Sequence, residues 1–277
     1  MVSTFVSSAG AARCRTSWES SVTHSAPRLG SLPWVARTGG QLSPTDRRAL
    51  MRPIAEVHAA NALGRAAMAL GIHSGRRAHI PPYGLRTPTS ALTTTAEQEG
   101  ARRLSPALLQ HSYRTFVFGA AIGHLEQIDV DRELLFAAAM LHDAGLQTLV
   151  TGVDFSLASA AIALEVAETV GLSTAATNVM RNAITLHLSP DVTLATDGPV
   201  AYLLSAGAAL DVIGLRSWML PPGLIDRIVA EHPRLAFKRE FASATAAEAA
   251  VVPWGRMHFL RRYGALDLAI RLAPFRS

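Results

Sequence analysis

The chain has 277 residues, enough for one large domain or for one domain with an extension. Apolar residues make up 49% of it, which allows a substantial core, yet no run approaches the roughly 18 uncharged apolar residues of a membrane span. The single cysteine, Cys14, excludes an intrachain disulfide framework and a cysteine-rich zinc site. We interpret it as a free thiol in an N-terminal tail.

The net charge of +5 is unevenly distributed. Residues 1–103 carry 13 arginines against 5 acidic residues, whereas residues 104–277 carry 13 basic and 16 acidic residues. The arginines are scattered and no aromatic residues are interleaved with them, which argues against binding to nucleic acid. We therefore expect a small-molecule partner, with no nucleic acid and no membrane, and the composition leaves a homo-oligomer open.

Residues 1–45 are rich in Ser, Thr, Gly, Ala and Arg and have no sustained period, so we expect a disordered or loosely ordered extension. The segment lacks the basic start and the long apolar run of a secretory signal. Its Arg- and Ser-rich composition also resembles an organellar transit peptide, but a disordered tail or an over-extended start is the interpretation we favour. The expected location is cytoplasmic.

Regular structure is expected to begin at Ser43. Ser43 can cap a helix, Pro44 suits its first position, and Asp46 places an acid in its first turn. This helix should continue to about Leu70, before a loop over residues 72–90 that contains Pro81-Pro82. We expect residues 46–90 to pack as a helix and a loop on the main domain.

Residues 91–277 are expected to form that main domain. Ser105-Pro106 repeats the start signal and predicts a helix to about Glu126, and Asp131 predicts a helix that ends at Gly145. Further helical patterns cover residues 156–170, 174–187, 199–213 and 222–231, with two more near 240–250 and 257–272. Few segments favour a strand. The sequence therefore predicts an all-α fold.

The dipeptide His142-Asp143 lies at the end of the most apolar stretch of the chain, residues 134–145. An ionisable pair in a buried segment is costly unless its charge is compensated, and a metal ion is a common compensator. His111 lies near the start of the helix that begins after Ser105. The positive end of the helix dipole disfavours protonation there, which suits a metal ligand, although a core or surface histidine is the alternative.

Asp211 provides a fourth candidate ligand. It shares a helix face with small and apolar residues and has no basic residue one turn away, so a buried cation would compensate its charge; a partly exposed carboxylate is the alternative. His111, His142, Asp143 and Asp211 would supply two nitrogens and two oxygens from three helices. Such a mixed set suits a divalent transition metal with one or two positions open for water.

The order of these residues resembles the metal-binding signature of the HD-domain superfamily, and is most similar to cyanamide hydratase-like HD proteins. The matching segments are Ser105-Pro106 with residues 111–119, residues 141–146, residues 183–187, residues 210–214 and Ala273-Pro274-Phe275. The resemblance covers about residues 85–275. It implies an HD-domain helical bundle and a metal-dependent hydrolase or hydratase.

The chain also departs from the superfamily. Many of its phosphohydrolases carry a lysine shortly after the His-Asp pair, and none is present at residues 145–147. Between the second and the last ligand the only histidine is His187, so we predict one metal ion, which could be Zn, Fe, Mn or Ni. An acidic residue typical of the subfamily is displaced to Asp154, which leaves Asp154 without an assigned role.

Three residues are candidates for catalytic roles. Asp143 could take the proton of a metal-activated water, and His187 could act as an acid or base, orient another group or be structural. Arg114 could pair with a ligand carboxylate or bind an anionic substrate. The sequence thus predicts metal-activated attack of water on a small molecule, either a phosphate ester or a cyanamide-like compound. The alternative is a non-catalytic or ligand-sensing helical module with a basic N-terminal arm.

Overall fold

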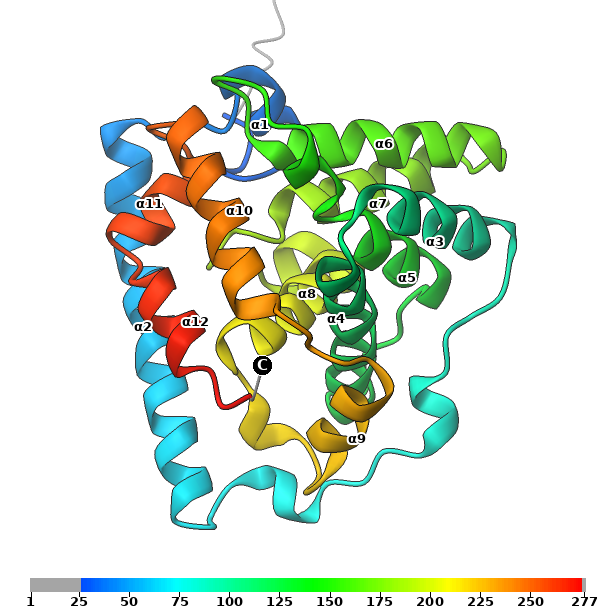
Figure 1. Cartoon of the computed structure of the whole chain (residues 1–277), viewed down its shortest axis with the longest axis vertical. Helices are drawn as coiled ribbons and strands as arrows, with labels where there is room; N and C mark the ends of the chain where they lie inside the picture. The colour runs from blue at the N-terminus through cyan, green and yellow to red at the C-terminus, as the bar shows by residue number, and fades with distance from the viewer. Residues whose placement is uncertain (1–25, 276–277) are drawn as a thin grey trace, which may run out of the picture.

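A computed structural model describes residues 26–275, and over this range it confirms the all-α prediction (Figure 1). Cys14 lies outside the described residues. The helices of the first half are α1 (Leu32–Thr38), α2 (Pro44–Ala69), α3 (Ala91–Arg103), α4 (Pro106–Leu125) and α5 (Arg132–Leu141). Those of the second half are α6 (Phe155–Thr169), α7 (Thr174–Leu186), α8 (Leu194–Ile213), α9 (Leu224–Glu231), α10 (Phe237–Val251), α11 (Arg256–Arg262) and α12 (Leu266–Leu272).

The helix starts follow the capping signals in the sequence. Ser43 accepts a hydrogen bond from the backbone N–H of Asp46, whose side chain accepts one in return from the backbone N–H of Ser43. Ser105 and Asp131 cap α4 and α5 in the same way, through bonds from backbone N–H groups of the first turn. These local contacts explain why the starts of the three helices could be predicted.

Three boundaries differ from the sequence-based expectation. The helix expected to end at Gly145 ends at Leu141, and the helix expected over residues 257–272 is divided into α11 and α12. Residues 1–45 were expected to be disordered or loosely ordered, but residues 32–38 form α1, in which Trp34 and Val35 are buried. A short helix that depends on tertiary packing gives too few turns for a hydrophobic period to be recognised.

Helix α5 occupies the centre of the main core. Every residue from Leu134 to Leu141 is buried, and α3, α4, α7 and α8 all pack against this helix. No helix in residues 26–275 is both long enough and apolar enough to cross a membrane. The continuous apolar run of the sequence is therefore explained by burial on all sides of one short helix.

Helices α4 and α8 cross with their backbones in close contact. A Cβ atom added at Gly207 of α8 would lie 2.1 Å from the carbonyl oxygen of Thr115, and one added at Gly119 would lie 2.6 Å from the carbonyl oxygen of Leu203. Because neither position has room for a side chain, the two glycines set the spacing between these helices. At this crossing, the first turns of α4, which carry His111, lie beside the last turns of α8, which carry Asp211.

The long helix α2 lies along one edge of the molecule beside α11 and α12 (Figure 1). Leu50 and Ile54 of α2 share a small apolar cluster with Trp34 and Phe259. Asn61 of α2 also donates a hydrogen bond to the carbonyl oxygen of Ile213, at the end of α8. Helix α2 therefore covers the side of the bundle at which α8 ends.

Candidate metal centre

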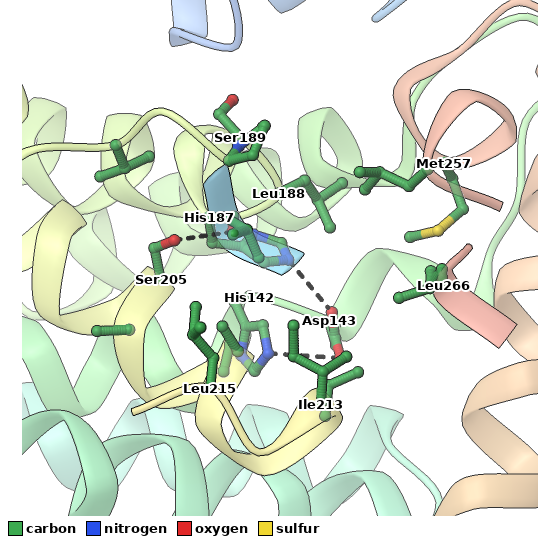
Figure 2. A pocket seen from close by; sticks show the side chains of 18 of the residues that line it. His142, Asp143, His187, Leu188, Ser189, Ser205, Ile213, Leu215, Met257 and Leu266 are labelled. Atoms are coloured by element: carbon green, nitrogen blue, oxygen red, sulfur yellow. Dashed lines mark hydrogen bonds and ion pairs between the residues drawn. The ribbon is translucent and has the colours of Figure 1, made fainter. Parts of the chain in front are cut away.

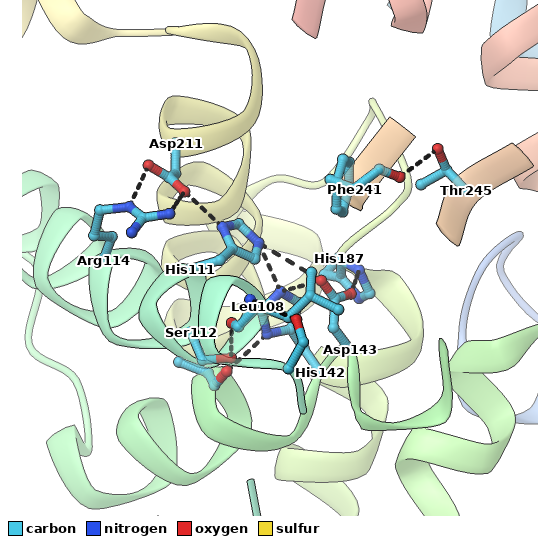
Figure 3. A network of polar contacts seen from close by, with 12 residues as sticks. Leu108, His111, Ser112, Arg114, His142, Asp143, His187, Asp211, Phe241 and Thr245 are labelled. Carbon is cyan, nitrogen blue, oxygen red and sulfur yellow. Dashed lines mark hydrogen bonds and ion pairs between the residues drawn. The ribbon is translucent and has the colours of Figure 1, made fainter. Parts of the chain in front are cut away.

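Three of the four predicted ligands converge in the structure. His111 lies in the second turn of α4, His142 caps the C-terminal end of α5, and Asp143 follows directly. One nitrogen of each histidine and one carboxylate oxygen lie within 4.8 Å of one another, and all three residues are buried. We call these three residues the candidate metal group; Figure 3 shows them with their polar contacts.

The chain turns sharply after Asp143 because Gly145 touches the start of α6. A Cβ atom at Gly145 would lie 2.2 Å from the carbonyl oxygen of Phe155, and the Gly145 N–H donates to Ser159 Oγ at 2.9 Å. Helix α5 therefore ends early, and residues 144–147 form a 3-10 turn. This turn fixes the backbone of the His-Asp pair between α5 and α6.

The hydrogen bonds of the rings determine where their protons lie. His142 Nδ1 is 2.7 Å from the carbonyl oxygen of Ala139, and His111 Nδ1 is 2.7 Å from Asp211 Oδ2. Because both partners are acceptors, Nδ1 carries a proton in each ring, and in the neutral form of each ring Nε2 keeps its lone pair. Burial lowers the pKa of His142, which favours this neutral form.

The free ring nitrogens create an arrangement that suits a cation. Nε2 of His111 and Nε2 of His142 lie 3.2 Å apart, so two lone pairs face each other and repel. Asp143 Oδ2, 3.4 Å from the His142 nitrogen and 3.6 Å from the His111 nitrogen, is buried and has no hydrogen-bond partner. Imidazole nitrogen and carboxylate oxygen are ordinary ligands of divalent transition metals, and this donor set fits such an ion.

His187 lies at the end of α7 beside this group. Its Nδ1 is 2.5 Å from the carbonyl oxygen of Ile184, so the proton lies on Nδ1, and Nε2 is 3.7 Å from Asp143 Oδ1. Burial, together with the neighbouring His142, lowers the pKa of His187 to about 3. The ring is therefore neutral near neutral pH, and its free Nε2 can accept a hydrogen bond at this edge of the site.

Asp211, the fourth predicted ligand, lies on the opposite side of the His111 ring from the candidate metal group. It binds His111 Nδ1, while Arg114 forms two hydrogen bonds with its carboxylate, at 2.8 and 2.9 Å. Burial raises the pKa of Asp211, but the hydrogen bond from His111 and the charge of Arg114 lower it by a larger amount. The carboxylate is therefore ionised. In this geometry Asp211 orients His111, and Arg114 pairs with a carboxylate rather than facing the cavity.

Arg234 is a third partner of Asp211 that the sequence analysis did not identify. Its Nη1 lies 2.5 Å from Asp211 Oδ1, and its guanidinium is sandwiched between the rings of Phe237 and Phe275, at 4.9 and 4.6 Å from their centroids. Arg234 follows α9 in an irregular segment with no periodic pattern, so its sequence context carried no signal of this role.

Asp154 belongs to a separate buried network. It caps α6 and forms an ion pair with Arg256 at 2.9 Å. Burial raises the pKa of Asp154, but the charge of Arg256 and the hydrogen bonds from Arg256 and Ser156 together lower it. Arg256 also donates to the carbonyl oxygen of Thr185, two residues before His187. The network therefore supports the end of α7 and does not line the site.

A cavity of about 220 Å³ opens over the candidate metal group (Figure 2). His142, Asp143 and His187 line its floor, and most of its remaining wall is apolar. Among residues 26–275, Arg216 is the only arginine or lysine that lines it, and Arg216 is held by Glu126 at 3.4 Å and by Tyr202. The described residues therefore enclose a buried histidine–carboxylate site beneath an apolar chamber, in an all-α protein.

Comparison with known proteins finds two similar curated sequences. Cyanamide hydratase DDI2 and cyanamide hydratase DDI3 of Saccharomyces cerevisiae are each 25% identical to this chain over 187 residues, which cover 65% of this chain and 80% of each relative. No protein-family model matches the chain. The similarity gives weak support to the HD-like resemblance that the sequence motifs carry.

Proposed function

We propose that this chain is a metal-dependent hydratase that adds water to a small neutral molecule with a carbon–nitrogen triple bond, such as cyanamide. At a coarse level, the cyanamide hydratase relatives and the His–Asp cluster support a metal-dependent hydratase or hydrolase. The observation that carries the finer proposal is the composition of the cavity. It ends on the candidate metal group, and the one basic side chain that residues 26–275 contribute to it, Arg216, already pairs with Glu126.

His111, His142 and Asp143 would hold the metal ion, with Asp211 fixing the ring of His111. A divalent metal in this position would act as a Lewis acid that lowers the pKa of water. The buried Asp143 oxygen without a partner and the two facing Nε2 atoms are the features that such an ion would satisfy. We propose one ion per chain because the group offers a single set of converging donors.

Hydration forms a carbon–oxygen bond and a nitrogen–hydrogen bond, and it breaks an O–H bond of water and one carbon–nitrogen π bond. The oxygen of water bonds to the nitrile carbon, one carbon–nitrogen π bond breaks, and the nitrogen takes up a proton; tautomerisation then gives the amide, which is urea when the substrate is cyanamide. Asp143 Oδ1 is placed to hold the proton lost by the water and to return it to the nitrogen, and His187 Nε2, 3.7 Å from it, is placed to orient the water by accepting a hydrogen bond. Both side chains are buried, so bulk water does not compete for that proton.

The test combines metal analysis with turnover of two substrate classes. The purified protein is expected to contain one divalent metal ion per chain and to convert cyanamide to urea, with no release of phosphate from aryl phosphate esters. His111→Ala should lose both metal and activity, whereas His187→Gln should keep the metal and lose at least about 100-fold in kcat. His124→Ala, at an exposed histidine of the same helix α4, is the matched control.

Three results would contradict the proposal. Release of phosphate in place of urea would assign the site to a phosphohydrolase. Bound metal without turnover of either substrate class would favour a ligand-sensing module. Full activity in a protein without metal, unaffected by His111→Ala, would exclude the candidate metal group as the reacting site.

A further inference from the structure

We propose that the natural substrate is a nitrile with an apolar tail of several carbon atoms, and that the cavity above the candidate metal group selects that tail. This inference rests on the proposed hydratase activity and names its substrate class.

The cavity is larger than the smallest nitrile-type substrates require. Its volume of about 220 Å³ corresponds to roughly seven water molecules at about 30 Å³ each. Cyanamide has three non-hydrogen atoms and would leave about half of this space unfilled. Water left beside it would face apolar walls, and apolar surfaces are poorly solvated by water. The size of the chamber therefore favours a longer molecule.

The walls are apolar on several sides. Val212 and Ile213 from the end of α8 and Leu215 beyond it form one wall, and Met257, Leu260 and Leu266 from α11 and α12 contribute another. Figure 2 shows Ile213, Leu215, Met257 and Leu266 around the space next to His142 and Asp143. An alkyl or aryl group is the ligand chemistry that such walls favour.

The polar side chains of the lining provide no site for a charged tail. Ser205 donates to the carbonyl oxygen of His187 at 3.2 Å, and Arg216 is occupied by Glu126 and Tyr202. Ser189 Oγ is buried without a partner, but a hydroxyl is neutral. A carboxylate at the far end of the substrate would lose its hydration without gaining a partner, so charged tails should be rejected.

Linear nitriles from propionitrile to heptanenitrile test the inference, because the reactivity of the nitrile carbon changes little along this series. For the metal-loaded enzyme, kcat/KM should rise about fourfold per methylene along this series. 6-Cyanohexanoate, which has the same number of carbon atoms as heptanenitrile but ends in a carboxylate, should react at least about 100-fold more slowly.

Ala209 offers a way to fill the chamber. It lines the cavity on α8, on the same helix face as Ser205 and Val212. Ala209→Phe should lower the ratio of kcat/KM for heptanenitrile to that for cyanamide at least about tenfold. Ala195→Phe, at an exposed alanine of the same helix, should leave the ratio unchanged. Metal content and thermal unfolding verify folding, and if Ala209→Phe does not fold, Ala209→Val replaces it with a smaller expected change.

Failure of this inference is distinguishable from failure of the proposed function. Hydration of cyanamide with no gain along the nitrile series, or an unchanged ratio in a folded Ala209 variant, would overturn the apolar-tail substrate and leave the hydratase intact. Absence of turnover with cyanamide and with every nitrile in the metal-loaded protein would overturn both.

Discussion

The two ring nitrogens of His111 face different parts of the site. Nε2 faces His142 and Asp143, whereas Nδ1 is held by Asp211, and Asp211 is itself held by Arg114 and Arg234. Two guanidinium groups thus fix one carboxylate, and the carboxylate fixes the ring. Partners of this kind set the tautomer and the orientation of a metal-binding histidine.

Arg234→Met should weaken metal binding without removing any residue of the candidate metal group. The variant leaves Asp211 with Arg114 alone, so the His111 ring is less firmly oriented, and metal affinity should fall about 10- to 100-fold. Competition with a chromophoric chelator measures the affinity. Arg52→Met, at an exposed arginine of α2, is the control. An unchanged affinity in Arg234→Met would show that the orientation of His111 does not depend on this arginine.

Some residues of the site could be predicted from the sequence, and others could not. His111, His142 and Asp143 were predicted because ionisable residues at the start of one helix and at the end of an apolar run need compensation in any fold. Asp211 was predicted as a ligand, but its position behind His111 depends on how α8 crosses α4. Arg234 depends on a loop that returns to α8, and no local pattern encodes such a contact.

At the scale of elements, the crossing of α4 and α8 positions the site. Gly119 and Gly207 allow the two backbones to touch, and this contact places Asp211 beside His111. The starts of α2, α4 and α5 were predictable because their caps are local. The division between α11 and α12 could not be predicted. It depends on Ala265, which adopts a left-handed conformation with a φ of 48°, and an alanine in a sequence does not indicate such a conformation.

Gly207→Ala should destabilise the fold and loosen the site together. The new Cβ would lie 2.1 Å from the carbonyl oxygen of Thr115, so α8 must move away from α4, at a cost of about 1–3 kcal/mol. Urea denaturation measures this loss, and metal affinity should fall in parallel. Gly84→Ala is the control, since a Cβ there meets only ordinary contacts at 3.8 Å. Equal stability of the two variants would contradict a tight crossing.

The contact between α6 and α10 predicts a dependence of stability on pH. Burial and the neighbouring Asp154 raise the pKa of Glu248 from 4.5 to about 7, despite the hydrogen bond from the Phe155 N–H and the charge of Arg256. The folded state therefore binds more protons than the unfolded state between these values. Its free energy of unfolding should fall as pH rises from about 4.5 to 7.

Glu248→Gln removes this titration. The free energy of unfolding of the variant should not decrease through titration of residue 248. The variant should therefore become more stable relative to the natural chain as pH rises toward 7. Urea denaturation at pH 4.5, 6 and 7.5 measures the difference. Exposed Glu133→Gln serves as the control. A difference that is the same at all three pH values would contradict the raised pKa.

At the scale of the whole molecule, the arginine-rich first third is joined to the rest by specific contacts. Arg28 pairs with Asp197 at 2.7 Å, and Trp34 of α1 packs with Leu50 of α2 and Phe259 of α11. The all-α class could be predicted from patterns along the whole chain. The attachment of α1 could not, because it rests on contacts with residues that are distant in the sequence, such as Asn182 and Phe259. We propose that residues 26–45 belong to the folded unit.

Trp34→Ala should lower the free energy of unfolding by about 3–5 kcal/mol, because it removes a buried ring from this cluster. Denaturation in urea provides the measurement. The control is Trp254→Ala, since Trp254 is 55% exposed and its loss should have a much smaller effect. Similar losses in the two variants would argue that α1 adds little to the stability of the fold.

The hydrogen bonds of the three histidines imply an order of events during folding. His142 and His187 take their ring orientation from carbonyl oxygens three residues earlier in their own chain segments, so these rings can be oriented as soon as α5 and α7 form. His111 instead depends on a carboxylate 100 residues away. Its orientation must wait until α4 meets α8, so we expect the last donor to be aligned only when the bundle closes. The rate at which a refolding chain binds metal would therefore report when α4 and α8 pack together.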